Sequence, residues 1–318
     1  ICASSNLPPH GGSLPVNPGM LQNKDRSGTG WTLAYSPLQD GGSASQLNTH
    51  LIWYTFRADG SPVWYMSDPI QISPPSATAP SFTTRLYEYR WDYNAPRGER
   101  LSKFGTPYAE VSGYFAANDQ TRLAVEWSLW QNAQKVGECL NDVSREFLSQ
   151  TLGGRVGVQA LSTQSVNLAF NGAYYDRSNS GWGMQQHVVR TDGQEGQSLF
   201  RETLALAIYD DGGRATWLLG LADGADALTP QPPSVGSWRQ LPLTLYRAQS
   251  GFNPANPCGP SGCAPFSAPA GRWFRQFVDT VTVQGALDVD YRGGIGGAAL
   301  TRFDVGVPPI APQTIPRS

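Results

Sequence analysis

The side chains of this sequence that could do chemistry are few and scattered. The three histidines, His10, His50 and His187, lie far apart, and serine and aspartate are plentiful enough to complete a Ser-His-Asp site around either of the last two. No Gly-x-Ser-x-Gly segment is present to expose a nucleophilic serine. Isolated histidines are more often surface or core residues, so we expect no catalytic residue. A secreted hydrolase is therefore only the third of three functional hypotheses.

Two pairs of neighbouring carboxylates could serve as the acid and base of glycoside hydrolysis. Asp210 and Asp211 lie in an expected Asp-Gly turn, where Asp is favoured for backbone reasons alone. Asp288 and Asp290 alternate with apolar residues, which places both on the wet face of one strand. We assign neither pair a catalytic role. Because phosphate-loop, calcium-loop and zinc-ligand spacings are also missing, we expect no cofactor and no metal.

The four cysteines indicate an oxidising compartment. Cys258 and Cys263 flank a Gly-Pro-Ser-Gly turn, and we predict a disulfide between them. We expect Cys2 to pair with Cys139, although four cysteines allow three pairings. The sequence starts with ICASSNLPPHGG, which resembles a processed N-terminus, and a lipidated Cys2 is the alternative. We therefore expect a secreted protein, located outside the cell, on its outer surface or in the periplasm.

Composition excludes several classes of partner and favours short strands. The 318 residues have a net charge of −2 and no basic stripe, so we expect no nucleic-acid partner. No apolar run approaches the ~18–20 residues of a membrane helix, so we predict no transmembrane segment. The 35 glycines and 25 prolines suit many short strands joined by turns.

One short sequence is present twice, as DRSGTGW at residues 25–31 and as DRSNSGW at residues 176–182. The similarity continues between LIWYTFRADGSPVWYM and LALAIYDDGGRATWLL, where Trp64 aligns with Trp217 without a gap. Trp31 aligns with Trp182 if two residues are inserted. This pattern predicts an internal duplication that produces two homologous domains, with these four tryptophans as duplicated structural residues.

The duplicated pattern resembles a tandem module of secreted Gram-negative bacterial proteins of unassigned function. In that module a Ser-Gly-x-Gly-Trp turn precedes a Trp-Tyr-rich strand, an Asp-Gly hairpin and a further Trp, as in SGTGW…WYTFRADGSPVW and SNSGWG…AIYDDGGRATW. The resemblance implies a secreted β-module and names no catalytic residue. The second copy has Leu206–Ala207 where the first has Trp53–Tyr54, so the two halves can differ in role.

We predict an all-β protein with two homologous antiparallel β-barrel or β-sandwich domains in tandem and one short linking helix. The helix is expected within Cys139–Gly154, where Val143, Phe147 and Thr151 recur at a spacing of four. The predicted divisions are an N-terminal arm at 1–19, β-domain 1 at 20–153, β-domain 2 at 154–305 and a Pro-rich tail at 306–318.

Our leading hypothesis is a secreted, non-catalytic binding or assembly module whose two Pro-rich ends engage neighbouring subunits. The alternative is a glycan-binding protein that uses exposed Trp and Tyr side chains. Aromatic residues that are not duplicated are the better candidates for such an interaction surface. They are Tyr87, Tyr89, Trp91, Tyr93 and Trp130.

Overall fold

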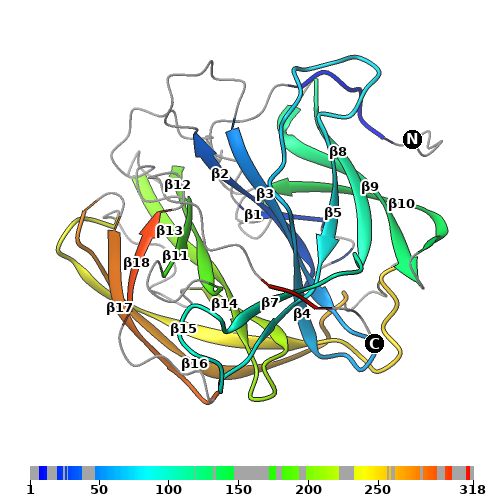
Figure 1. The fold of residues 1–318 in the computed structure, drawn as a ribbon. Coiled ribbons are helices and arrows are strands. Elements are labelled where there is room, and N and C mark those ends of the chain that lie inside the picture. Colours follow the sequence, from blue (N-terminus) through cyan, green and yellow to red (C-terminus); the bar gives the residue numbers. More distant parts are fainter. Residues whose placement is uncertain are drawn as a thin grey trace.

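The structure is a computed structural model, and it describes only part of the chain. The described residues are 7–12, 20–23, 26, 28–37, 47–117, 119–131, 134–146, 172–176, 181–192, 198–221, 233–255, 258, 262–279, 282–291, 298–302 and 313–315. Within them the protein is all-β, as predicted, and no helix is long and apolar enough to cross a membrane. Figure 1 shows two curled sheets side by side.

Both sheets are antiparallel and close on themselves, which makes each predicted β-domain a barrel rather than a sandwich. Successive strands of each barrel are neighbours, except that one small excursion separates β5 from β8. The first barrel consists of β1 (Met20–Gln22), β2 (Gly30–Pro37), β3 (Leu47–Phe56), β4 (Pro62–Ser67), β5 (Phe82–Tyr87), β8 (Ala109–Ala116), β9 (Asp119–Gln131) and β10 (Gln134–Glu146).

The second barrel repeats this order of strands without the excursion. Its strands are β11 (Gly172–Tyr175), β12 (Gly183–Asp192), β13 (Ser198–Tyr209), β14 (Ala215–Leu221), β15 (Trp238–Arg247), β16 (Phe266–Phe277), β17 (Thr282–Val289) and β18 (Ala298–Arg302). The predicted domain junction, near residues 153–154, lies outside the described residues.

Strand register shows which residues of the two barrels are equivalent. Trp31 pairs with Trp53 in barrel 1, and Met184 pairs with Leu206 in barrel 2, the same number of residues later in the chain. The counterpart of Trp31 is therefore Met184, and the alignment of Trp31 with Trp182 is wrong by two residues. Aligning the two tryptophans by residue identity required a gap of two residues, whereas the strand pairing of the two barrels corresponds without a gap. Trp182 is nevertheless buried, as expected for a structural residue.

The predicted linking helix is also wrong over the part that is described. Residues up to Glu146 belong to β10, and Val143 pairs with Ala124 of β9. A spacing of four residues suits one face of a helix, but it is also an even number and therefore suits one face of a strand. Residues 147–154 of the predicted helix lie outside the described residues.

The predicted disulfide between Cys258 and Cys263 is present, with their Cα atoms 4.8 Å apart. The second expected disulfide, between Cys2 and Cys139, stays a prediction, because Cys2 and the side chain of Cys139 lie outside what the structure describes.

The described parts of the two ends lie on this chain's own barrels. At the N-terminal end, the amide of Gly12 donates to the carbonyl of Phe115, and the Tyr114 hydroxyl donates to the carbonyl of Pro8. At the C-terminal end, β19 (Gln313–Ile315) adds in parallel to the β6–β7 hairpin. This hairpin, β6 (Tyr89–Trp91) and β7 (Leu101–Phe104), is the excursion between β5 and β8.

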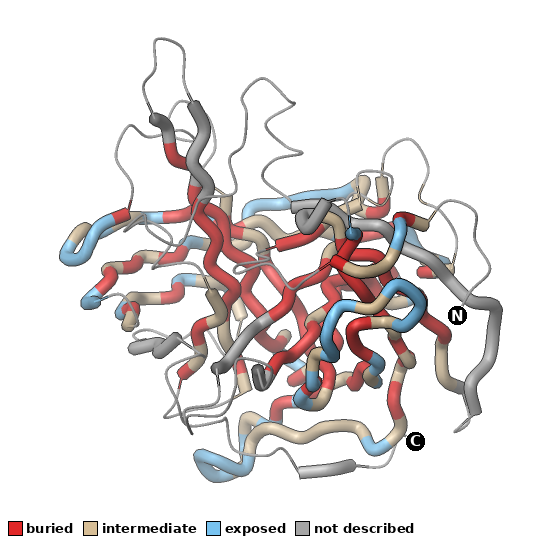
Figure 2. The backbone as a smooth tube through the Cα atoms, turned by 90° about the horizontal axis from the view of Figure 1, so that it is seen from above, coloured by how far each residue is buried: buried red, intermediate tan, exposed pale blue. Residues whose placement is uncertain are grey.

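Side chains fill both barrels, and Figure 2 shows buried segments running through the centre of the molecule. In barrel 1 the indole of Trp53 stacks on Trp31 at 5.0 Å and meets the edge of Trp127 at 4.7 Å. In barrel 2 the buried aromatic side chains include Trp273 and Phe277.

The interior of barrel 2 contains a buried charged cluster. Glu202 accepts hydrogen bonds from Arg275, from Arg239 at 3.0 Å and from the Gln186 amide at 2.8 Å. Glu202 and Arg275 are fully buried. The charged pair is stable there because each ion has a partner of opposite sign.

Among the described residues, the equivalent place in barrel 1 has no charged side chain, and the counterpart of Glu202 there is the buried Thr49. There Phe82 stands opposite Gly113, as Arg239 stands opposite Arg275, and the Phe82 ring covers the glycine. The two interiors have therefore diverged although their strands have not.

Removing one member of this buried pair should be costly. We predict that Glu202→Gln lowers the free energy of unfolding by about 3–5 kcal/mol, because Arg275 keeps its charge without a partner. The control is Glu110→Gln at the more exposed pair with Arg85, which should cost at most about 1 kcal/mol. Urea denaturation measures both. Equal losses in the two variants would show that the buried pair is not structural.

Candidate functional site at the seam between the barrels

The two barrels meet along β4 and β14, a contact that we call the seam. The duplicated tryptophans Trp64 and Trp217 lie here. The Nε1–H of Trp64 donates to the carbonyl of Ile208 at 3.1 Å, and that of Trp217 donates to the carbonyl of Thr55 at 2.9 Å. Ile208 is the counterpart of Thr55 in the shared register, so each barrel gives the other the same hydrogen bond. The seam is thus a pseudo-twofold interface.

Two hairpin turns frame the seam, and both have the same geometry. In the first, the amide of Gly60 donates to the carbonyl of Arg57, and Arg57 donates to Ser61. This is a three-residue loop that ends in a left-handed residue, and Gly60 has φ of 81°. In the second turn the equivalent residue is Gly213, with φ of 71°. The Asp-Gly signals predicted both hairpins, although the left-handed residue of the second is Gly213 rather than Gly212.

Each turn holds a segment of the other barrel. The carbonyl of Gly60 accepts the amide of Ala248, which follows β15, and the carbonyl of Gly213 accepts the amide of Trp91 in β6. A Cβ atom on either glycine would collide with the backbone carbonyl of the residue that it holds. Two independent constraints therefore require glycine at each of these positions: the positive φ angle and the close approach of the opposite backbone.

Aromatic rings fill the seam in matched pairs. Trp64 stacks on Tyr89 at 5.4 Å, and Trp217 stacks on Tyr246 at 5.8 Å. Trp91 stacks on Tyr209 at 5.3 Å. Such contacts add to the stabilisation that burial alone provides.

These contacts correct the predicted interaction surface. Tyr87, Tyr89 and Trp91 are buried, and the hydroxyl of Tyr93 donates to the carbonyls of Tyr209 and Asp210. We predicted an interaction surface here because these aromatic residues are not duplicated, but the second barrel covers most of them.

Trp130 lies apart from the seam. It is half-buried, and the guanidinium of Arg85 lies 4.9 Å from its ring centre.

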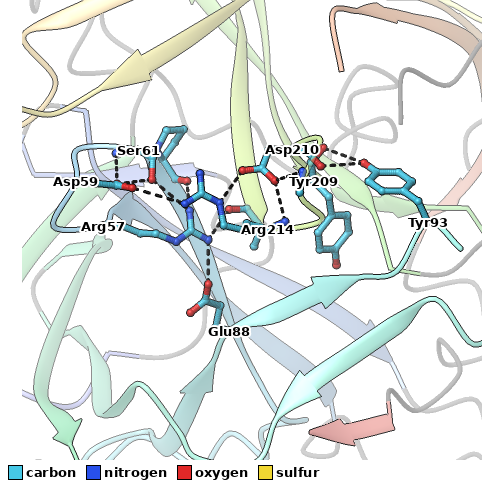
Figure 3. A network of polar contacts seen from close by, with 11 residues as sticks. Arg57, Asp59, Ser61, Glu88, Tyr93, Tyr209, Asp210 and Arg214 are labelled. Carbon is cyan, nitrogen blue, oxygen red and sulfur yellow. Dashed lines mark hydrogen bonds and ion pairs between the residues drawn. The ribbon is translucent and has the colours of Figure 1, made fainter. Parts of the chain in front are cut away.

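A polar network crosses the seam between the two turns (Figure 3). Arg57 of barrel 1 donates to the carboxylate of Glu88 and to the carbonyl of Ala215 in barrel 2, both at 2.9 Å. Arg214 of barrel 2 pairs with Asp210 at 2.9 Å and reaches Asp59 of barrel 1 at 3.6 Å. Each arginine therefore links its own turn to the opposite barrel.

Two groups of this network, Asp59 and Arg214, have pKa values shifted in favour of their ionised forms. The Ser61 hydroxyl lowers the pKa of Asp59 by donating to it, with further help from Arg214 and Arg57. A hydrogen bond to Asp210 is the main cause that raises the pKa of Arg214. Asp210 also accepts the amides of Gly212 and Arg214, which is the turn-forming role predicted for it. These groups hold the turns and are poorly suited to proton transfer.

The described contacts of the three histidines are structural. His50 is buried, and its Nδ1–H donates to the carbonyl of Ser67 at 3.0 Å. Burial lowers the pKa of His50. The neighbouring Ser67 is fully buried, and its hydroxyl accepts the amide of Leu51. Nδ1 of His187 accepts the amide of Met20 at 3.2 Å, and the ring of His10 lies on Tyr114.

One side of the seam is hollow. A pocket of about 250 Å³, which we call the seam pocket, lies between β1–β2 of barrel 1 and β13–β15 of barrel 2. Its inner wall contains buried residues, among them Thr32, Tyr54 and Trp217, whereas Thr29 and Leu221 are partly exposed. The lining residues are Met20, Leu21, Gln22, Gly28, Thr29, Gly30, Trp31, Thr32, Tyr54, Ala205, Trp217, Leu219, Leu221 and Tyr246.

The predictions from sequence missed this pocket. Its residues come from segments far apart in the chain, and the duplication alone does not show which faces of the two barrels meet. Among the described residues no group of three or more His, Cys, Asp and Glu side chains could hold a metal ion.

Comparisons of this chain with protein families, with curated proteins and with solved structures find no match. The resemblance of the two copies to a secreted Gram-negative module stays a prediction, and function has to be argued from the seam itself.

The reciprocal indole bonds give a direct test of the seam. We predict that Trp64→Phe and Trp217→Phe each lower the free energy of unfolding by about 0.5–1.5 kcal/mol more than Trp127→Phe, because each removes a hydrogen bond that crosses the seam. Trp127 is the matched control, since its buried Nε1–H bonds to no described residue. Chemical denaturation measures all three. Equal losses would mean that the reciprocal bonds do not hold the barrels together.

The buried tyrosines predict the alkaline limit of stability. Burial raises the pKa of Tyr54, Tyr89 and Tyr209 above the ordinary value of 10.0. Above pH 10 the unfolded chain loses these phenol protons while the folded chain keeps them, so stability falls as pH rises. The slope is about 1.4 kcal/mol per pH unit for each tyrosine. Urea midpoints between pH 8 and 11 should show a shallower fall in Tyr89→Phe, and an unchanged fall would contradict this.

Proposed function

We propose that the protein is a non-catalytic binding module that works outside the cytoplasm, and that it binds its ligand in the seam pocket. The observation that carries this proposal is the chemistry of the pocket lining. Among the described residues that line it there is no Asp, Glu, His, Lys, Arg or Cys. Such a lining can enclose a molecule, but it lacks the groups that act as general acids and bases near neutral pH.

The construction of the seam supports binding. The pocket walls belong to two barrels that are joined by reciprocal hydrogen bonds, two interlocked turns and stacked aromatic rings. A site whose walls are already held in place loses little conformational entropy when a ligand enters.

The disulfide between Cys258 and Cys263 supports a location outside the cytoplasm, because cytosolic thiols are normally kept reduced. Location in the extracellular space, on the outer surface or in the periplasm of a Gram-negative bacterium is part of the proposal.

Between binding and assembly, the described contacts favour binding. If the two ends of the chain packed on a neighbouring subunit, they would support assembly. Instead, β19 pairs with β7, and Gly12 bonds to Phe115, within the same chain. The described contacts of both ends therefore lie within one chain, and we propose binding rather than assembly.

The glycan alternative loses its expected surface. Tyr89 and Trp91 are buried. The exposed aromatic side chains Trp238 and Phe266 lie at opposite ends of the β15–β16 ladder, so they do not form a row.

A thermal-shift screen tests this function with a chemically mixed set of small molecules: neutral and charged aromatics, amines, monosaccharides and dipeptides. A ligand at a hundred times its Kd stabilises the folded state by about 2.7 kcal/mol, which raises Tm by several degrees. We predict that at least one class raises the Tm of the wild type and does not raise that of Ala205→Phe. That variant places a large ring in the pocket from β13.

The matched control is Ile52→Phe. Ile52 is the counterpart of Ala205 in the shared register and does not line the pocket, so this variant should respond like the wild type. If no class raises the Tm of the wild type, or if Ala205→Phe responds equally, the seam pocket is not a binding site.

A further inference from the structure

We propose that the ligand of the seam pocket is a small, uncharged, mainly apolar molecule that contains a flat ring, bound one per chain. This inference rests on the proposed binding function and goes further by naming the chemical class of the ligand.

The size of the pocket limits the ligand to one or two rings. An engineered protein cavity of about 150 Å³ takes a benzene molecule, and the seam pocket has about 250 Å³. This volume suits a molecule between benzene and a fused bicyclic ring. It is too small to enclose a whole lipid with its headgroup or a whole oligosaccharide.

The walls favour a flat ring. The indole of Trp217 stacks on Tyr246, with their planes 18° apart, and the ring of Tyr54 meets Trp217 edge-on at 6.0 Å. Aromatic faces and edges in this arrangement offer a further ring both stacked and edge-to-face contacts. Leu219 and Ala205 complete the apolar wall from barrel 2.

The lining disfavours a charged ligand. None of its described side chains is charged, so none could form an ion pair with a carboxylate or an ammonium group. Burying an ion without a partner costs far more than burying a neutral ring stabilises, so the neutral member of any related pair of compounds should bind more tightly.

A few polar groups could orient the ligand. Thr32, Gln22 and Thr29 belong to the barrel 1 side of the lining, and the hydroxyl of Thr29 already donates to the carbonyl of Arg26. This small number of polar side chains suits a ligand with one polar group, such as a ring N–H or a hydroxyl, rather than one with many hydroxyls.

The pseudo-twofold counterpart of the pocket has different chemistry, which predicts one ligand per chain. Ile52 replaces Ala205 there, and Ala207 replaces Tyr54 in the shared register. The counterpart is therefore bulkier at one position and lacks an aromatic ring at another.

Isothermal titration calorimetry with indole, indole-3-acetate and methyl glucoside tests the class of ligand. We expect indole to bind the wild-type chain with a stoichiometry of one, and at least about tenfold more weakly to Ala205→Phe. Ile52→Phe should bind indole within about twofold of the wild type. Indole-3-acetate should bind at least about tenfold more weakly than indole, and methyl glucoside should not bind.

The outcomes separate the two proposals. If indole-3-acetate or methyl glucoside binds more tightly than indole and Ala205→Phe abolishes that binding, the site stands and the proposed class of ligand is wrong. The class is also wrong if indole does not bind the wild type while the thermal-shift screen finds another ligand that Ala205→Phe excludes. If neither method finds a ligand sensitive to Ala205→Phe, the proposed function fails together with its ligand.

Discussion

The reciprocal hydrogen bonds of Trp64 and Trp217 are the contact on which the arrangement of the two barrels depends. Each indole N–H is satisfied only by a backbone carbonyl of the other barrel, so separating the barrels would leave two donors and two acceptors without these partners. The same contact brings the two glycine turns against the opposite barrel and aligns the stacked rings. It also sets the distance between β1–β2 and β13–β15, and that distance creates the seam pocket.

Duplication followed by divergence explains why a nearly symmetric molecule has different side chains at equivalent places in its two halves. Each half has the same backbone hydrogen bonds and one Gly turn, because these features depend little on side chains. Where side chains decide, the halves differ: Phe82 over Gly113 in barrel 1 is replaced by Arg239 and Arg275 in barrel 2. The seam follows the same rule: its reciprocal hydrogen bonds and turns are paired, but residues that line the pocket, such as Ala205, differ from their counterparts, such as Ile52.

The sequence predicted what local chemistry determines. The Asp-Gly turns, the all-β class, the duplication and the Cys258–Cys263 bond follow from residue types and short spacings. The predicted helix failed because a spacing of four residues suits a helix face and a strand face alike. The predicted interaction surface failed because the burial of Tyr89 and Trp91 depends on a second barrel whose placement no local pattern encodes. The pocket and the buried Glu202–Arg275 pair have the same origin, since both join strands distant in sequence.

The central claim is that the seam makes one cooperative body of two barrels, and differential scanning calorimetry of the intact chain tests it most directly. If the barrels unfold together, a single transition appears and its calorimetric enthalpy equals its van't Hoff enthalpy. The account predicts that result. Two transitions, or a calorimetric enthalpy about twice the van't Hoff value, would show that the barrels unfold independently and would contradict it.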